Sequence, residues 1–537
     1  MTGASELKQQ VRKLATLVAL ASVLTSCVAT PAPARSGPAP AAGARSAARW
    51  PPIDVDWAHD AVGYEIFVRS FSDSDGDGVG DLRGVIERLD LLNDGDPATS
   101  DDLGVDLLWL MPTFSSPSYH GYDVVDFDTV NPQYGTRQTL QQLVAAAHRR
   151  GMRVLLDLPL NHTSDRHPWF VDAATSPTSH HRDWYLWRSD DPGWGQPWNA
   201  GARSWHRAGS GYYYGLFWGG MPDLNWSNGE VRSAIADSML RWLDLGVDGF
   251  RLDAVRHLVE SGPGSGQSDA SATHRHLREL AARLAVRRSD VLLIGEIWAD
   301  AATIAPYYGA AGEPELGATY DFPLASAIVD GVRDRQAQPL ADALQTIIQC
   351  YPVGAVDITF VDNHDQVRLA SQLGDDDAGL RQAAALLLTL PGTPFIYYGD
   401  EIGQRNGPTG DDEDKRRPLA WANVASQRAD PTSLLSLYRQ LIRLRQRWQP
   451  LRRGTTEVLV GMPHGDAVLA LQRRAGEQRL LVLHNLTDQP AEAGPFLIEA
   501  TAVRPLWTSA PSAEPMAVLG AIGVLLPPRA SGVWLIE

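Results

Sequence analysis

Short apolar runs alternate with helical patterns along most of the chain, and this alternation limits the possible folds more than any other feature. Eight runs of strand length follow residue 60, and amphipathic segments separate them; one such segment has Leu140, Leu143 and Ala147 on one face and ends before Gly151. Eight strands, each followed by a helix, predict a (β/α)8 TIM barrel. The expected strands are 64–70, 105–112, 152–161, 247–253, 290–298, 318–323, 355–365 and 393–401.

Two segments depart from this alternation. Residues 161–230, between the third and fourth expected strands, are rich in aromatic residues, Gly and Pro and show no clear helix, which predicts a small inserted domain. After about residue 450 the pattern changes to alternating strands, which predicts a C-terminal antiparallel β-sandwich over 451–537. The barrel would then consist of residues 53–160 and 231–450.

The N-terminus reads as a targeting segment. Basic residues precede an apolar stretch at 14–24, which is too short to span a bilayer and ends in "LTSC". This ending resembles the bacterial lipoprotein processing box, which implies a signal peptide over 1–26, acylation of Cys27 and a lipid-anchored, flexible linker over 27–52. The implied location is the bacterial cell envelope, in the outer membrane or periplasm or at the cell surface. The alternative is an ordinary secretory signal that is cleaved later, near "PAPA".

The charge of the chain argues against one class of partner. The formal net charge is -17, and there is no cluster of Lys and Arg. Because nucleic-acid binding depends on cationic side chains that neutralise phosphates, we expect no nucleic-acid partner. The acidity instead suits cation binding, and the 17 Trp residues suit both core burial and stacking on flat, neutral ligands.

Charged residues stand at the ends of three expected strands, where a barrel carries its active site. Arg251 and Asp253 share one face of the fourth strand, because strand side chains repeat every two residues, while Glu296 and Asp365 follow the fifth and seventh strands. A neighbouring arginine favours an ionised Asp253, and apolar neighbours would raise the pKa of Glu296. We therefore predict a glycosidase in which Asp253 is the nucleophile, Glu296 the acid/base and Asp365 a stabiliser of charge on the sugar.

Five motifs support this interpretation: "DLPLNHTS", "MPDLN", "GFRLDAVRH", "GEIW" and "FVDNHD". These motifs occur in the same order as in the α-amylase family of retaining glycoside hydrolases, glycoside hydrolase family 13, and the chain resembles that family over residues 60–440. The resemblance implies the same three carboxylate roles and an α-glucan substrate. It also implies a set of substrate-binding residues around the first sugar and beyond: His120, Tyr122, Asp123, His162, Arg251, Arg256, His257, Trp298 and His364.

Two calcium sites are expected. "DSDGDGVGD" at 73–81 presents hard oxygen ligands and resembles the loop after the first strand in oligo-1,6-glucosidases and related amylases. That resemblance implies one Ca²⁺ held by Asp73, Asp75, Asp77, Asp81 and the Val79 carbonyl; the alternative is a solvated turn. A second Ca²⁺, between barrel and inserted domain, is implied by Asn161, Asp223 and the His257 carbonyl, and its remaining ligand within 165–220 is left open.

Further residues favour one branch of the family. Arg256 and His257 resemble the Lys-His pair that α-amylases place at the +2 sugar, and Trp298 also resembles the amylase and neopullulanase side. "MPDLN" is the form of the group intermediate between oligo-1,6-glucosidases and neopullulanases. We therefore expect endo-acting hydrolysis of α-1,4-glucan.

Alternatives to this function remain open. One is an exo-acting α-glucosidase, an oligo-1,6-glucosidase or a trehalose synthase-type transglucosidase on short maltooligosaccharides. Another is a surface lipoprotein that only binds glucan, against which the complete set of carboxylates argues. The aromatic residues of the inserted segment can be glucan platforms or core: Trp169, Trp184, Trp187, Trp194, Trp198, Trp205 and Tyr212–Tyr214. Residues 411–421, after the eighth strand, are expected near the mouth of the cleft without an assigned role.

Overall fold

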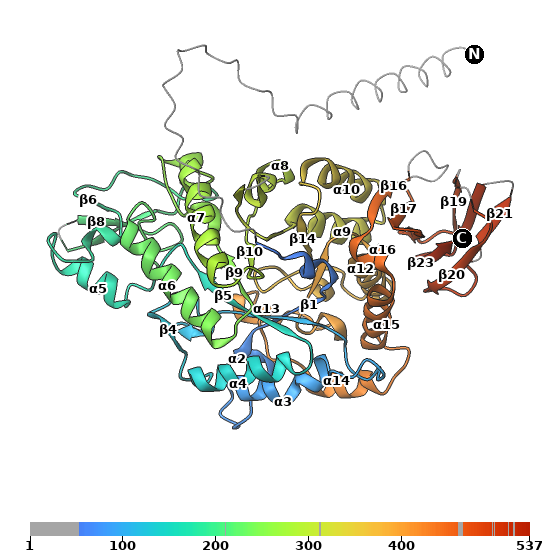
Figure 1. Ribbon diagram of the computed structural model, residues 1–537, viewed down its shortest axis with the longest axis horizontal. Coiled ribbons are helices and arrows are strands. Elements are labelled where there is room, and N and C mark those ends of the chain that lie inside the picture. Colours follow the sequence, from blue (N-terminus) through green and yellow to red (C-terminus); the bar gives the residue numbers. More distant parts are fainter. Residues whose placement is uncertain are drawn as a thin grey trace, which may run out of the picture.

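Eight parallel strands close into a barrel in the order β1-β15-β14-β13-β10-β9-β5-β2, which confirms the predicted (β/α)8 fold. Figure 1 labels β1, β5, β9, β10 and β14 of these strands among the surrounding helices. The computed structural model describes residues 53–209, 211–310, 313–459, 466–496, 498, 500–513, 515–518 and 521–537. The barrel strands are β1 Gly63–Ile66, β2 Leu107–Leu110, β5 Arg153–Pro159, β9 Gly249–Asp253, β10 Leu292–Gly295, β13 Ala318–Tyr320, β14 Val356–Thr359 and β15 Thr393–Tyr397.

The strands are shorter than the apolar runs that predicted them. The run over 64–70 was expected to be one strand, but β1 ends at Ile66 and a helical turn, α2 Val68–Phe71, follows. Val68 and Phe71 are buried like the strand residues before them, and continuous burial leaves no periodicity that separates strand from helix. The loops that carry the functional residues therefore begin earlier than expected.

The helices around the barrel follow local sequence signals. α4 Arg137–His148 begins with a capping box between Thr136 and Thr139, and it buries the predicted apolar face. α6 Gly229–Leu245 ends at Gly246, whose φ of +114° favours glycine. The other long helices packed around the strands are α3 Leu82–Leu92, α7 Ser271–Arg287, α9 Phe322–Asp334, α10 Gln338–Cys350, α12 Asp377–Thr389 and α15 Leu434–Arg447.

The segment after β5 forms a small unit beside the barrel, at the left in Figure 1. It contains a three-stranded antiparallel sheet of β6 Trp187–Arg188, β8 Gly211–Tyr214 and β7 Trp205–Ala208. The expectation that it holds no helix is wrong, because α5 Pro168–Thr175 forms there with proline in its first turn. Its tryptophans divide: Trp184 and Trp205 are buried, whereas Trp198 is 54% exposed.

The C-terminal part consists of two antiparallel sheets, in agreement with the predicted sandwich. The first has the order β16-β17-β18-β23-β20 and the second β19-β22-β21. Their apolar faces form a separate core that includes Leu481, Phe496, Ile522 and Trp534. The strands are β16 Thr455–Val458, β17 Val468–Ala475, β18 Gln478–Asn485, β19 Ala491–Phe496, β20 Val503–Thr508, β21 Pro515–Val518, β22 Ala521–Leu526 and β23 Ser531–Ile536.

The predicted targeting segment is not described by the structure. The expected signal peptide over 1–26, Cys27 and the linker over 27–52 all lie outside the described residues. Within the described ranges, no helix is both long and apolar enough to cross a membrane.

Candidate active site

The three predicted catalytic carboxylates meet at the C-terminal ends of the barrel strands. Asp253 is the last residue of β9, Glu296 directly follows β10, and Asp365 lies in the loop after β14. A cleft of about 630 Å³ opens there, and its walls include Glu296, Asp365 and Trp298. The short strands thus deliver side chains from distant parts of the sequence to one edge of the barrel.

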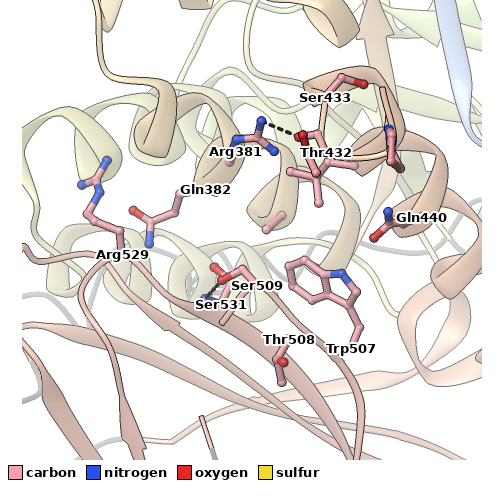
Figure 2. Close-up of a pocket in the computed structure, with 13 residues that line it drawn as sticks. Arg381, Gln382, Thr432, Ser433, Gln440, Trp507, Thr508, Ser509, Arg529 and Ser531 are labelled. Atoms are coloured by element: carbon pink, nitrogen blue, oxygen red, sulfur yellow. Dashed lines mark hydrogen bonds between the residues drawn. The ribbon is translucent and has the colours of Figure 1, made fainter. Parts of the chain in front are cut away.

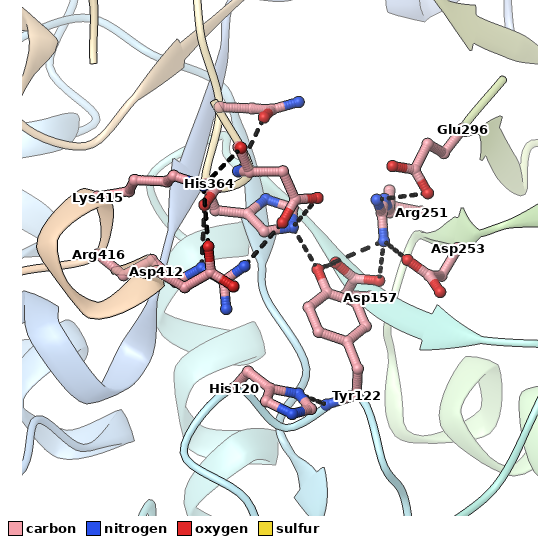
Figure 3. Close-up of polar contacts among 12 residues, drawn as sticks. His120, Tyr122, Asp157, Arg251, Asp253, Glu296, His364, Asp412, Lys415 and Arg416 are labelled. Atoms are coloured by element: carbon pink, nitrogen blue, oxygen red, sulfur yellow. Dashed lines mark hydrogen bonds and ion pairs between the residues drawn. The ribbon is translucent and has the colours of Figure 1, made fainter. Parts of the chain in front are cut away.

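Arg251 is the centre of this arrangement (Figure 3). Its side chain is 1% exposed, and its Nη1 donates to Asp253 Oδ1 at 2.7 Å and to Asp157 Oδ1 at 2.8 Å. Its Nη2 lies 3.0 Å from Glu296 Oε2. The planar guanidinium therefore fixes both predicted catalytic carboxylates at once. The predicted pairing of Arg251 with Asp253 is confirmed, and Asp157 is a partner that local sequence reasoning missed.

The argument that local surroundings separate the pKa values of Asp253 and Glu296 is wrong. Burial raises the pKa of Asp253 well above its usual range; Arg251 opposes this increase, and the charge of Glu296 adds to it. The surroundings of Glu296 are not apolar alone, because it contacts Arg251, accepts from the Ala254 N–H at 3.1 Å and accepts from Trp298 Nε1 at 2.9 Å. The immediate environments therefore do not assign the two roles, which rest on position in the family motifs.

A buried chain of polar contacts orients the third carboxylate. His364 Nδ1 lies 2.6 Å from Glu65 Oε1, and its Nε2 lies 2.7 Å from the Tyr122 hydroxyl and 3.1 Å from Asp365 Oδ2. Although burial opposes protonation, Asp365 and Glu65 raise the pKa of His364 to about 9. His364 is therefore a cation at neutral pH, held between two carboxylates. Glu65 was not predicted as a site residue.

Asp365 has a second cationic partner. Arg416 Nη2 donates to Asp365 Oδ1 at 2.7 Å, and Arg416 Nε donates to the His364 carbonyl at 3.0 Å. Burial raises the pKa of Asp365, but His364 and Arg416 outweigh it and hold that pKa well below its usual range. The side chain is 38% exposed at the cleft, so water screens part of this effect. Arg416 belongs to the segment 411–421, for which the sequence suggested no role. Its contact with Asp365 shows that this segment helps to hold the third carboxylate.

The predicted first-sugar residues surround this chain. The Tyr122 hydroxyl donates to Asp157 at 2.9 Å, and its ring stacks on that of His364 with 5.6 Å between centroids. The His120 ring also stacks on the Tyr122 ring, with 6.1 Å between centroids. Tyr122 is therefore held in position by contacts with two imidazole rings and by the hydrogen bonds of its hydroxyl.

Two further predicted residues are buried. Asp123 accepts hydrogen bonds from the hydroxyls of Ser116 and Ser118, so it orders the loop before Tyr122. His162 is fully buried beside Phe217, neither of its nitrogens has a partner among the described residues, and burial lowers its pKa to about 3. Contact of Asp123 and His162 with sugar stays a prediction.

The residues expected at the +2 sugar all line the cleft. Arg256 is paired with Asp269 and donates to the Trp298 carbonyl, and its guanidinium is therefore held in place. His257 Nδ1 lies 2.8 Å from the Gln267 carbonyl, and burial lowers the pKa of His257 to about 4. The Trp298 side chain is 46% exposed. Trp198, from the inserted segment, also lines the cleft.

The first expected calcium loop is partly assembled. The carboxylates of Asp73, Asp75 and Asp81 have oxygens within 4.8 Å of one another, and such oxygens suit Ca²⁺. Asp77 is not in this group, and its carboxylate accepts the Val79 N–H at 2.7 Å. The structure thus brings together three of the four predicted carboxylates.

The second expected calcium site contains two acids that each have one buried oxygen without a hydrogen-bond partner among the described residues. Asp223 is fully buried; its Oδ1 accepts the Leu216 N–H at 3.0 Å, but its Oδ2 has no partner. Burial raises the pKa of Asp223 to about 7. Glu260 Oε1 is also buried and unpartnered, and burial together with the charge of Asp223 raises the pKa of Glu260. Unpaired buried carboxylates are costly, so this group fits a cation, with Asn161 and His257 as the other predicted ligands.

Paired carboxylates held by one arginine at the C-terminal end of a (β/α)8 barrel define a glycoside hydrolase site. Comparison with known proteins agrees. Residues 65–454 match the family described as Alpha amylase, catalytic domain. The chain belongs to this family.

Individual relatives carry different activities in their names. The chain is 35% identical over 456 residues to Alpha-amylase 3 of Dictyoglomus thermophilum, a match that covers 80% of this chain and 85% of the relative. It is 34% identical over 385 residues to an oligo-1,6-glucosidase of Halalkalibacterium halodurans, with 66% and 67% covered. The crystal structure of an alpha-amylase from H. orenii matches with a TM-score of 0.80 and 38% identity, covering 89% of this chain and 99% of that one.

Proposed function

We propose that this glycoside hydrolase is an endo-acting α-amylase that cleaves α-1,4-glucosidic bonds of starch and maltooligosaccharides with retention of configuration. The observation that carries the proposal is the cleft beside the catalytic carboxylates, whose wall includes two half-exposed tryptophans, Trp198 and Trp298. Aromatic faces of this kind suit stacking against sugar rings. Arg256 and His257 line the same cleft as Glu296, which suits a substrate with several sugars on the leaving-group side.

The geometry supports a two-step reaction. Asp253 attacks the anomeric carbon and forms a glycosyl-enzyme bond while Glu296 gives its proton to the departing glycosidic oxygen. Water then attacks the anomeric carbon, Glu296 takes the proton from that water, and the bond to Asp253 breaks. Arg251 favours the ionised form of Asp253 through its 2.7 Å contact. Asp365, kept ionised by His364 and Arg416, stabilises the positive charge that develops on the sugar ring.

An exo-acting α-glucosidase or oligo-1,6-glucosidase is the second candidate. It is favoured by the similarity to the oligo-1,6-glucosidase of Halalkalibacterium halodurans and by the fact that Arg256, the proposed +2 contact, is already paired with Asp269. Product profiles on soluble starch and on maltotriose separate the two. An endo-amylase gives mixed oligosaccharides and a rapid loss of iodine staining on starch. Release of glucose alone, with slow loss of staining, would reject the endo-acting proposal.

We also propose that the protein binds Ca²⁺ in one or both of the acidic groups described above. Asp73, Asp75 and Asp81 would hold one ion, and Asp223, with the newly identified Glu260, would hold the other. A bound cation would neutralise these carboxylates and stabilise the native fold. Attachment to a membrane through Cys27 stays a prediction.

A further inference from the structure

Trp298 contacts the predicted acid/base directly, in a way that the proposed two-step reaction does not use. Its indole Nε1 donates to Glu296 Oε1 at 2.9 Å. The ring is 46% exposed at the cleft and packs on Phe322, with 4.2 Å between centroids. Arg256 donates to the Trp298 carbonyl, so the backbone of this residue is also held. The indole N–H therefore has a defined position beside the carboxylate.

The other oxygen of Glu296 already has two donors. Oε2 accepts the Ala254 N–H at 3.1 Å and lies 3.0 Å from Arg251 Nη2. A carboxylate offers about four hydrogen-bond positions, two on each oxygen. Ala254 and Arg251 fill those of Oε2, and Trp298 fills one on Oε1. Among the donors that the structure describes, this leaves one position on Oε1 for the proton that passes to a glycosidic oxygen.

The same contact bears on the charge of Glu296. A hydrogen bond donated to a carboxylate favours its ionised form. Glu296 has to be protonated when the leaving group departs and ionised when water attacks, so the strength of this contact affects both steps. The indole nitrogen only donates and cannot take up the proton itself. Trp298 therefore acts on the reaction through the carboxylate.

We propose that Trp298 is a positioning residue for the acid/base: its indole N–H directs the catalytic proton to the remaining position on Glu296 Oε1 and favours the ionised carboxylate that accepts a proton from water. The sequence resemblance implied only a substrate-binding role for Trp298. The inference rests on the proposed role of Glu296 as acid/base. It is independent of whether the enzyme cleaves within glucan chains or at their ends.

The test replaces Trp298 by Phe, which keeps an aromatic ring beside Phe322 but removes the N–H. The readout is the pH profile of kcat/KM on maltoheptaose, because its alkaline limb reports loss of the acid's proton in the free enzyme. A hydrogen bond to a charged group changes proton affinity about 10- to 100-fold, and we take the lower value because the indole is half-exposed. Trp298→Phe should therefore move the alkaline limb up by about one pH unit, since the acid form persists to higher pH.

Two controls make the same substitution at other tryptophans. Trp198→Phe changes the other half-exposed tryptophan of the cleft, whose ring lies against Phe217 and His257. Trp507→Phe changes a partly buried tryptophan in a pocket between α12, α15 and β20 (Figure 2), whose lining residues all differ from those of the cleft. Both controls should keep the alkaline limb of the unsubstituted enzyme.

A second measurement does not depend on the folding of Trp298→Phe. In enzyme with ¹⁵N-labelled tryptophan, one indole N–H resonance should shift with pH along the alkaline limb, and this titration should be lost in Glu296→Gln. An unchanged alkaline limb in folded Trp298→Phe, an equal shift in Trp198→Phe, or the lack of such a resonance would overturn the proposal. Loss of activity in Glu296→Gln without a shift in Trp298→Phe rejects this inference alone. Near-full activity in Glu296→Gln on maltoheptaose instead rejects the proposed function.

Discussion

Replacing Glu65 by Gln tests whether His364 is held as a cation beside the third carboxylate. The contact between Glu65 Oε1 and His364 Nδ1 is 2.6 Å long and fully buried. A hydrogen bond between charged groups contributes about 1.5–3 kcal/mol, which corresponds to roughly one to two pKa units. The pKa of His364, raised to about 9 by Asp365 and Glu65, should therefore fall to roughly 7–8 in Glu65→Gln.

The sign of the effect follows from the charges around the ring. Glu65 and Asp365 contact its nitrogens, Tyr122 shares Nε2, and Arg416 binds the His364 carbonyl. Because protonation is favoured in the folded protein, the imidazolium and its contribution to stability are present at low pH and are lost as pH rises through the folded pKa. In Glu65→Gln this loss moves down to pH 7–8, and kcat/KM should decline there while matching the unsubstituted enzyme near pH 5.5.

The assay is an NMR titration of ¹⁵N-histidine-labelled protein, with His364 assigned by substitution, alongside pH profiles of kcat/KM on maltoheptaose. Glu401→Gln is the matched control, because it removes another buried carboxylate that instead accepts from Tyr64 at 3.0 Å. The control should leave the His364 titration near pH 9. A neutral His364 at pH 7 in the unsubstituted enzyme, or an unshifted titration in Glu65→Gln, would refute the reasoning.

The remaining predictions concern catalysis, calcium and the +2 sugar. Asp253→Asn and Glu296→Gln should each reduce starch hydrolysis by several orders of magnitude, and both variants should stay folded at the assay temperature. Near-full activity in either variant would contradict the assigned roles. Chelation should lower the melting temperature, and Asp75→Ala should remove most of that sensitivity whereas Asp77→Ala should retain it, since only Asp75 belongs to the converging group. Arg256→Ala should reduce kcat/KM about 10–100-fold more on maltoheptaose than on p-nitrophenyl glucoside. Equal losses on both substrates would show that Arg256 only supports the loop through Asp269.

The sequence predicted those parts of the site that depend on local pattern. Strand ends are marked by a change from apolar to charged residues, so the positions of Asp253, Glu296 and Asp365 followed from the strand prediction. Glu65 and Arg416 were missed because they lie about 350 residues apart along the chain and meet near His364 only when the barrel closes. No local signal distinguishes such a residue from other strand or loop residues.

The same limit explains the other errors. The neighbours of Glu296 in sequence are apolar, but the closed barrel brings Arg251 to it from the adjacent strand. Helix α5 was missed because its aromatic-rich stretch shows no helical periodicity, although His167 caps its first turn and Pro168 begins it. Glu260 lies outside the segment in which a further calcium ligand was sought.

The charge balance of the whole site supplies the argument for catalysis that the local environments do not. Arg251, His364 and Arg416 are the cations of the cluster, and its carboxylates are those of Glu65, Asp157, Asp253, Glu296 and Asp365. If all five carboxylates were ionised, two negative charges would stay uncompensated in a largely buried space, which favours uptake of a proton. Glu65 and Asp365 are tied to His364, and Asp157 and Asp253 share one nitrogen of Arg251. Burial raises the pKa of Asp253, Arg251 opposes this increase and the charge of Glu296 adds to it, so the proton is held among the carboxylates around Arg251, a group that includes Glu296 at the cleft.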